Sequence, residues 1–328
     1  MTSVAQASQA SAAAAAEPFQ ILSLDGGGIR GVFSAAILAA IEEDLNIRLT
    51  DHFDLIAGTS TGGIIAIGLG LGLRPADILG FYLEQGPHIF SNPLRLRSAL
   101  WWFWRKYRAD ALETGLRATF GDRAFGESTK RLVVPSYDVG NDDVYIFRTA
   151  HDQRLRRDYR VPAWKVALAT SAAPTYFPAC RAVDQLRLID GGVWANNPAM
   201  VAIIEAVGTL RVPLDRIRLM SVGTYDAVVR RPRVLDRAGA LLWASSATDV
   251  LLRSGSIAVN NQAKFLLGKQ NVLRIDPRVP AADVSIDRVS GLEALVARAR
   301  HHSRHVMPEV HRQFVGHTAP AFTPLYTP

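Results

Sequence analysis

The pentapeptide Gly-Thr-Ser-Thr-Gly at residues 58–62 carries the clearest chemical signal in the sequence. It lies between two short apolar segments, which predicts a strand, a sharp turn and then a helix. A serine on such a turn exposes its hydroxyl, and small flanking residues let the two backbones approach closely. The pattern therefore predicts that Ser60 is a nucleophile, with Gly58 and Gly62 supporting its turn.

Asp190 is the candidate base for this serine. It ends a short apolar segment and is followed by Gly191 and Gly192, which allow a tight turn. Aspartate is a weak base at neutral pH because its reference pKa is about 3.9. Burial would raise that pKa, and a rigid contact between serine and aspartate could then replace a histidine.

Three consecutive glycines, Gly26, Gly27 and Gly28, separate an apolar strand pattern from a helical pattern. Backbone amides at a glycine-rich helix start form an anion site, and in acyl transfer that anion is the tetrahedral oxyanion. We expect these glycines to form the oxyanion hole. Arg30 would either add positive charge there or pair with a nearby carboxylate.

The same glycine segment allows a second interpretation. Gly26, Gly28 and Gly31 fit the dinucleotide-binding pattern G-x-G-x-x-G. Asp25 directly precedes the glycines, and its negative charge is awkward beside a pyrophosphate. The nucleophile pattern follows within the same strand–helix–strand unit, so the dinucleotide alternative is the weaker one.

Residues 25–31, 58–62 and 190–192 resemble the three signature motifs of patatin-like phospholipases, and the resemblance extends over about residues 19–225. Further similarity occurs at residues 169–178 and 221–224. The resemblance implies a dyad of Ser60 and Asp190 without a catalytic histidine, and an oxyanion hole at the glycine segment. It implies hydrolysis of membrane glycerophospholipid esters, with no cofactor and no metal.

The arginine- and leucine-rich helices after residue 225 resemble those of phospholipase effectors in bacterial antiphage nucleotide signalling (CBASS). This narrower resemblance implies a cyclic di- or trinucleotide activator, which is not a cofactor, and a homo-oligomer formed on activation. The alternatives are a constitutive patatin-like esterase or lipase without nucleotide control, and a lipid-binding pseudoenzyme.

Composition and patterning predict one α/β domain. Apolar strands alternate with amphipathic helices, and 48% of the residues are hydrophobic, which favours a three-layer α/β/α fold with a mostly parallel central sheet. We expect a disordered tail at residues 1–17, a catalytic domain at residues 18–315 with a helical extension after about residue 226, and a loose tail at residues 316–328.

The net charge of +7 favours attraction to anionic lipids or nucleotides. No nucleic-acid-binding motif accompanies this charge, so nucleic acid is not an expected partner. The N-terminus lacks the basic start and apolar core of a signal peptide, which predicts a cytoplasmic protein acting at the inner membrane surface. His301 and His305 share a predicted helical face, but no carboxylate lies at ligand spacing, so no metal site is predicted.

Trp101, Trp102 and Trp104 lie in a basic segment at residues 94–108. Indole rings prefer membrane interfaces and arginines contact lipid phosphates, so this segment is a candidate membrane contact or lid. A packed core helix is an equally good interpretation. A third use would be base stacking for a nucleotide activator.

Overall fold

The computed structural model describes residues 17–89, 107, 109–225, 227–228, 233–237, 239–277, 279–280 and 291–328. The predicted disordered tail falls outside the described residues except for Glu17. The candidate membrane contact at Trp101, Trp102 and Trp104 also lies outside them.

The described residues form a seven-stranded sheet with the order β4-β3-β2-β1-β6-β8, and β5 pairs separately with β3. Neighbouring strands are parallel from β3 to β8, whereas β4 and β5 run antiparallel to β3. Two short strands, β7 (Ala227–Val228) and β9 (Val279–Pro280), pair outside this sheet. The strands of the large sheet are β1 (Phe19–Leu24), β2 (Leu55–Gly58), β3 (Arg131–Asp138), β4 (Asp143–Arg148), β5 (Leu188–Asp190), β6 (Ile217–Val222) and β8 (Val272–Ile275).

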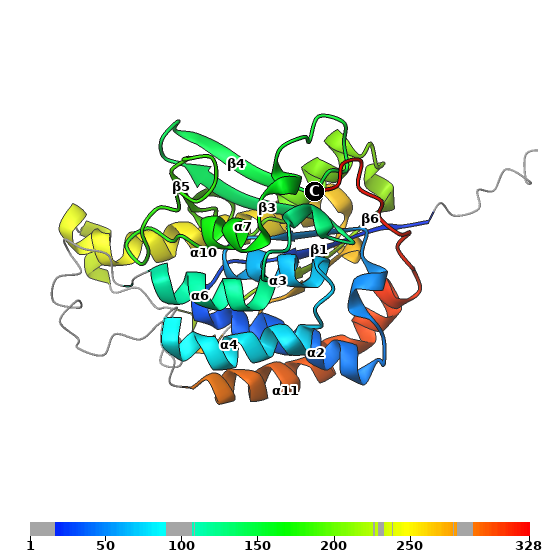
Figure 1. The fold of residues 1–328 in the computed structure, drawn as a ribbon. Coiled ribbons are helices and arrows are strands. Elements are labelled where there is room, and N and C mark those ends of the chain that lie inside the picture. The colour runs from blue at the N-terminus through cyan, green and yellow to red at the C-terminus, as the bar shows by residue number, and fades with distance from the viewer. Residues whose placement is uncertain are drawn as a thin grey trace, which may run out of the picture.

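Helices cover both faces of the sheet (Figure 1). One face carries the larger group: α2 (Gly31–Asp44), α3 (Thr61–Gly70), α4 (Pro75–Ile89), α6 (Ala109–Phe120), α7 (Ala163–Thr170) and α11 (Leu292–Val310). The other face carries α9 (Ala199–Ile204) and the long α10 (Ala240–Leu267), and the short α8 (Gly192–Ala195) contacts both α10 and β3.

Alternation along the central strands divides the apolar residues between two cores. In β1, Leu22 and Leu24 face the core below α2 and α3, whereas Ile21 faces the core below α9 and α10. In β2, Ile56 faces the first of these cores and Leu55 faces the second. All five side chains have no exposed surface, as expected for strands covered on both faces. The predicted three-layer α/β/α fold with a mostly parallel sheet is confirmed.

The pairing of β3 brings β5 to the end of β2. Residues 131–133 of β3 pair with β2, and residues 136–138 pair with β5. Because β4 occupies the other edge of β3, β5 continues along the edge on which β2 ends. Asp190, the last residue of β5, therefore lies just beyond Gly58, the last residue of β2.

Residues 316–328 contain no helix or strand, and several of them bond to the domain. The ring of His317 lies 3.0 Å from the carboxylate of Asp54, and Ala319 donates its amide to the carbonyl of Asp51. Across the part of the chain that the structure describes, no helix is long and apolar enough to span a membrane.

Candidate active site

Ser60 lies on the sharp turn between β2 and α3, with φ of 55° and ψ of −123°. A positive φ is strained for a residue with a side chain, as is common for functional residues on sharp turns. The tight turn requires glycine at residue 58, because a Cβ there would lie 2.1 Å from the carbonyl oxygen of Gly62. The Ser60 amide donates to Thr170 Oγ1 at 3.0 Å, and that hydroxyl donates to the carbonyl of Pro135 at 2.6 Å.

The carboxylate of Asp190 lies close to the Ser60 side chain, and the Ser60 hydroxyl favours its charged form. The amide of Gly192 donates to Asp190 Oδ1 at 2.7 Å, and the Asp190 amide donates to the carbonyl of Ala172 at 3.0 Å. Burial raises the pKa of Asp190 to about 6, although the nearby Ser60 hydroxyl and the bond from Gly192 lower it in part. The carboxylate is therefore held in place and is more basic than an exposed aspartate.

The glycine segment lies directly against Ser60. A Cβ on Gly26 would lie 3.2 Å from the Cβ of Ser60 and 2.6 Å from Asn196 Oδ1. The amide of Gly26 donates to the carbonyl of Asn196 at 2.9 Å, so it already has an acceptor. Among the described residues, the amides of Gly27 and Gly28 have no acceptor. Of the three predicted oxyanion donors, only Gly27 and Gly28 therefore have amides that are free to receive an anion.

Arg30 braces the glycine segment from within the same turn. Its Nε and its backbone amide both donate to the carbonyl of Gly27, each at 3.3 Å. The other predicted motif residue, Gly191, packs against the neighbouring strand, where a Cβ would lie 2.3 Å from the carbonyl oxygen of Pro135. Both residues hold backbone in position around the site.

A buried ion pair lies behind the glycine segment. Arg274 in β8 donates to both oxygens of Asp25 at 2.8 and 2.6 Å, and to Ser221 Oγ at 2.7 Å. The side chains of Arg274 and Asp25 are only 10% and 3% exposed. The Arg274 guanidinium thereby balances the charge of the Asp25 carboxylate. This pairing reduces the repulsion that Asp25 would exert on an anion at the glycine segment.

Sequence reasoning assigned no role to Thr170, Asn196 or Arg274. Thr170 lies inside the segment 169–178, which has motif similarity, and Asn196 lies four residues after the motif at residues 190–192, but neither position indicated a role. Arg274 lies in no motif, and no local pattern pointed to it.

The model of the patatin-like phospholipase family matches residues 22–203. The chain belongs to this family. The matched segment contains the glycine segment, Ser60 and Asp190, and the prediction of a lipolytic serine-type hydrolase is confirmed at the level of the family.

Curated patatin-like relatives match most of the chain. A cGAMP-activated phospholipase of Pseudomonas aeruginosa is 33% identical over 83% of this chain and 83% of its own length. A cGAMP-activated phospholipase of Vibrio cholerae is 29% identical over 86% of this chain and 89% of its own length. Patatin-like protein 4 of Arabidopsis thaliana is 38% identical over 78% of this chain and 75% of its own length.

In the described part of this patatin-like chain, no histidine bonds to Ser60 or Asp190. The buried His151 pairs with Glu205 at 2.9 Å, and His317 pairs with Asp54. The described residues also contain no cluster of three or more histidine, cysteine, aspartate or glutamate side chains that could hold a metal ion.

Proposed function

We propose that this chain is a phospholipase that hydrolyses acyl esters of membrane glycerophospholipids, with Ser60 as nucleophile and Asp190 as base. One observation carries the proposal: the Ser60 side chain lies close enough to the buried carboxylate of Asp190 to affect its pKa, which burial raises to about 6. A base with this pKa is ionised at neutral pH and still has a useful affinity for a proton.

The reaction follows from these positions. Asp190 takes the hydroxyl proton while Ser60 Oγ bonds to the ester carbonyl carbon, and the amides of Gly27 and Gly28 stabilise the oxyanion. The carbon–oxygen bond to the leaving alcohol then breaks, and Asp190 returns its proton to that alcohol. Water, deprotonated by Asp190, attacks the acyl-enzyme, and the fatty acid leaves as Ser60 is reprotonated. In this scheme backbone amides provide the electrophilic assistance, so the step requires no cofactor.

Access from a lipid surface is supported by exposed apolar side chains beside the dyad. Val193 and Trp194, which follow directly after Gly192, are 48% and 37% exposed. Trp194 is oriented by its indole nitrogen, which donates to the carbonyl of Ser136 at 2.9 Å. We assign the site of action to the inner surface of the cytoplasmic membrane.

Control by a cyclic nucleotide is the second part of the proposal. It is supported by the names of the Pseudomonas and Vibrio relatives, both of which are called cGAMP-activated phospholipases. Unrestrained hydrolysis of the host's own membrane would be harmful, so a gate suits an antiphage effector. Activation would act through a homo-oligomer. The plant relative, at 38% identity, is named only as a patatin-like protein and its name mentions no nucleotide, so the alternative is a constitutive patatin-like lipase.

The test measures fatty acid release from vesicles of bacterial phospholipids, with and without a panel of cyclic di- and trinucleotides. Wild type is compared with Ser60→Ala and with Ser254→Ala, an exposed serine on α10 that serves as the matched control. Release by wild type and Ser254→Ala, and not by Ser60→Ala, supports the dyad. Full release by a folded Ser60→Ala variant contradicts it. Release by wild type without any nucleotide contradicts the proposed nucleotide control but not the dyad.

A further inference from the structure

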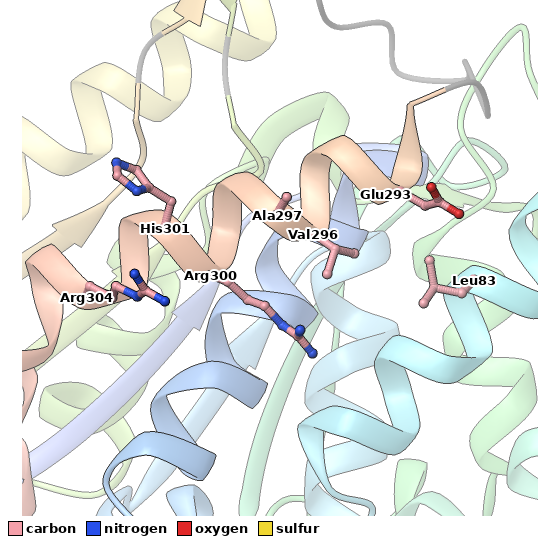
Figure 2. Close-up of a pocket in the computed structure, with 7 residues that line it drawn as sticks. All are labelled: Leu83, Glu293, Val296, Ala297, Arg300, His301 and Arg304. Atoms are coloured by element: carbon pink, nitrogen blue, oxygen red, sulfur yellow. The ribbon is translucent and has the colours of Figure 1, made fainter.

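A groove lies between Leu83 of α4 and one face of α11. Both helices pack against α2 on the same side of the sheet (Figure 1). Its volume is about 430 Å³, within the range of small-molecule sites. Leu83 of α4 forms one wall, and Val296 and Ala297 of α11 form the apolar centre. Figure 2 shows the lining residues of α11 along one stretch of the helix, with Leu83 opposite.

The charges in this groove are separated along the helix. Glu293 lies at the end nearest Leu83, and Arg300, His301 and Arg304 lie at the other end (Figure 2). Arg300 and Arg304 are exposed and one helical turn apart, so both guanidinium groups can reach the same anion. Neither arginine forms an ion pair with any described residue.

We propose that this groove binds a nucleotide phosphodiester, with the phosphate at Arg300 and Arg304. This inference rests on the nucleotide control proposed above and gives it a location. Glu293 and Arg300 are separated by seven residues, or roughly 10 Å along the helix. That span matches a nucleotide whose base lies on Val296 and Ala297 and whose ring N–H groups face the Glu293 carboxylate. A phospholipid headgroup shares the phosphate but has no planar base for the apolar centre.

Residues on the opposite side of α11 contact Tyr225, which follows the residue packed against the glycine segment. Arg298 donates to the hydroxyl of Tyr225 at 3.1 Å, and the ring of Phe33 lies 5.1 Å from that of Tyr225. Tyr225 follows Thr224, whose side chain would lie 2.2 Å from a Cβ on Gly27. Tyr225 also has φ of 69°, a conformation that only tertiary contacts maintain. A ligand that shifts α11 would therefore act on the backbone that carries the Gly27 amide.

The first experiment measures binding of cGAMP by isothermal titration calorimetry. Arg300→Glu and Arg304→Glu are compared with wild type and with Arg181→Glu, an exposed arginine beside β5 that changes the net charge equally. We expect each groove variant to weaken binding at least about tenfold, since each loses a charge-assisted bond to phosphate. Arg181→Glu should bind as wild type does. Equal weakening in all three variants, or in none, overturns the site.

Two further measurements identify the source of the phosphate. Inorganic phosphate should compete with cGAMP only weakly, because it lacks the base. Vesicles with anionic phospholipids should sediment the Arg300→Glu and Arg304→Glu variants as they sediment Arg181→Glu. Selective loss of vesicle binding in the groove variants, with cGAMP binding intact, would assign the groove to lipid headgroups and overturn the proposal.

The link to the active site is tested separately with Tyr225→Phe, which removes the hydroxyl that Arg298 contacts. We expect this variant to bind cGAMP normally and to show less nucleotide-stimulated fatty acid release. Unchanged stimulation overturns the link. Binding is measured without turnover, so a wild type that binds cGAMP through the arginines but releases no fatty acid would overturn the proposed hydrolysis and leave the groove assignment standing.

Discussion

The substitution Asp190→Asn should make the protein inactive and, at neutral pH, more stable. Burial raises the folded-state pKa of Asp190 to about 6, whereas the reference value is 3.8. The protonated form is therefore favoured by folding, so its contribution to stability is complete below pH 3.8 and is lost as the pH rises through about 6. The difference between these two pKa values corresponds to about 3 kcal/mol. Asparagine has nearly the same shape and carries no charge at any of these pH values.

The assay is urea denaturation of wild type and Asp190→Asn between pH 4 and pH 8. The free energy of unfolding of the variant, relative to wild type, should rise between pH 4 and pH 7 by up to about 3 kcal/mol and then level off. Fatty acid release by the variant should fall by at least about 100-fold. Release by wild type should increase with pH through about 6. A relative stability that does not change with pH would refute the argument that desolvation sets the basicity of Asp190.

Asp138 provides the matched control for this pH series. It lies in the neighbouring strand, and although burial raises its pKa, bonds from Gly140, Asn141 and Arg187 lower it further, so the net pKa is below the ordinary value. The stability of the asparagine variant relative to wild type should therefore change with pH in the opposite direction from that of Asp190→Asn. Asp138→Asn should lose stability relative to wild type as the pH rises from the acidic range, and a gain in stability would contradict this assignment.

Two further substitutions test the support of the glycine segment. Gly27→Ala would place a Cβ 2.2 Å from the buried side chain of Thr224, so we expect it to lose about 1–3 kcal/mol of stability and at least about 100-fold in kcat. The control is Gly80→Ala, at a helical position with open space, which should gain about 0.5–1 kcal/mol of stability. Equal changes in the two variants would contradict the clash. Arg274→Met leaves the buried Asp25 carboxylate without its main partner and should cost about 3–5 kcal/mol, measured by urea denaturation, with a loss below about 1 kcal/mol contradicting the role of the pair.

The central features of the fold were predictable because they are encoded locally. Strand–turn–helix patterns mark Ser60 and the glycine segment, and a strand followed by a glycine turn marks Asp190. Each of these signals is contained in about ten residues. The layer order follows from the alternation of apolar strands with amphipathic helices. The antiparallel direction of β5 was not predictable, because a strand of three residues contains too little sequence to specify its partner.

Other features depend on contacts between distant segments. Asp25 and Arg274 are separated by 249 residues, and neither has a neighbouring sequence that specifies the other. The sequence also could not show which glycine amides are free. That depends on the carbonyl of Asn196, which approaches Gly26 from the segment after β5. The sequence therefore predicts which residues carry the chemistry, and the tertiary structure determines which of their atoms can perform it.

The region after residue 225 resembles the patatin pattern least, yet it contacts the segment that resembles it most. Ser256 of α10 is buried and accepts a bond from the Asn196 side chain at 3.1 Å, next to the carbonyl that holds the Gly26 amide. Arg274 of β8 holds Asp25, and Arg298 of α11 contacts Tyr225. All three elements contact residues that pack behind the glycine segment, whereas Ser60 and Asp190 lie in the part of the chain that precedes these elements. If the proposed oxyanion hole and dyad are correct, changes in this region would alter oxyanion stabilisation without moving Ser60 relative to Asp190, which is the property that the proposed nucleotide control requires.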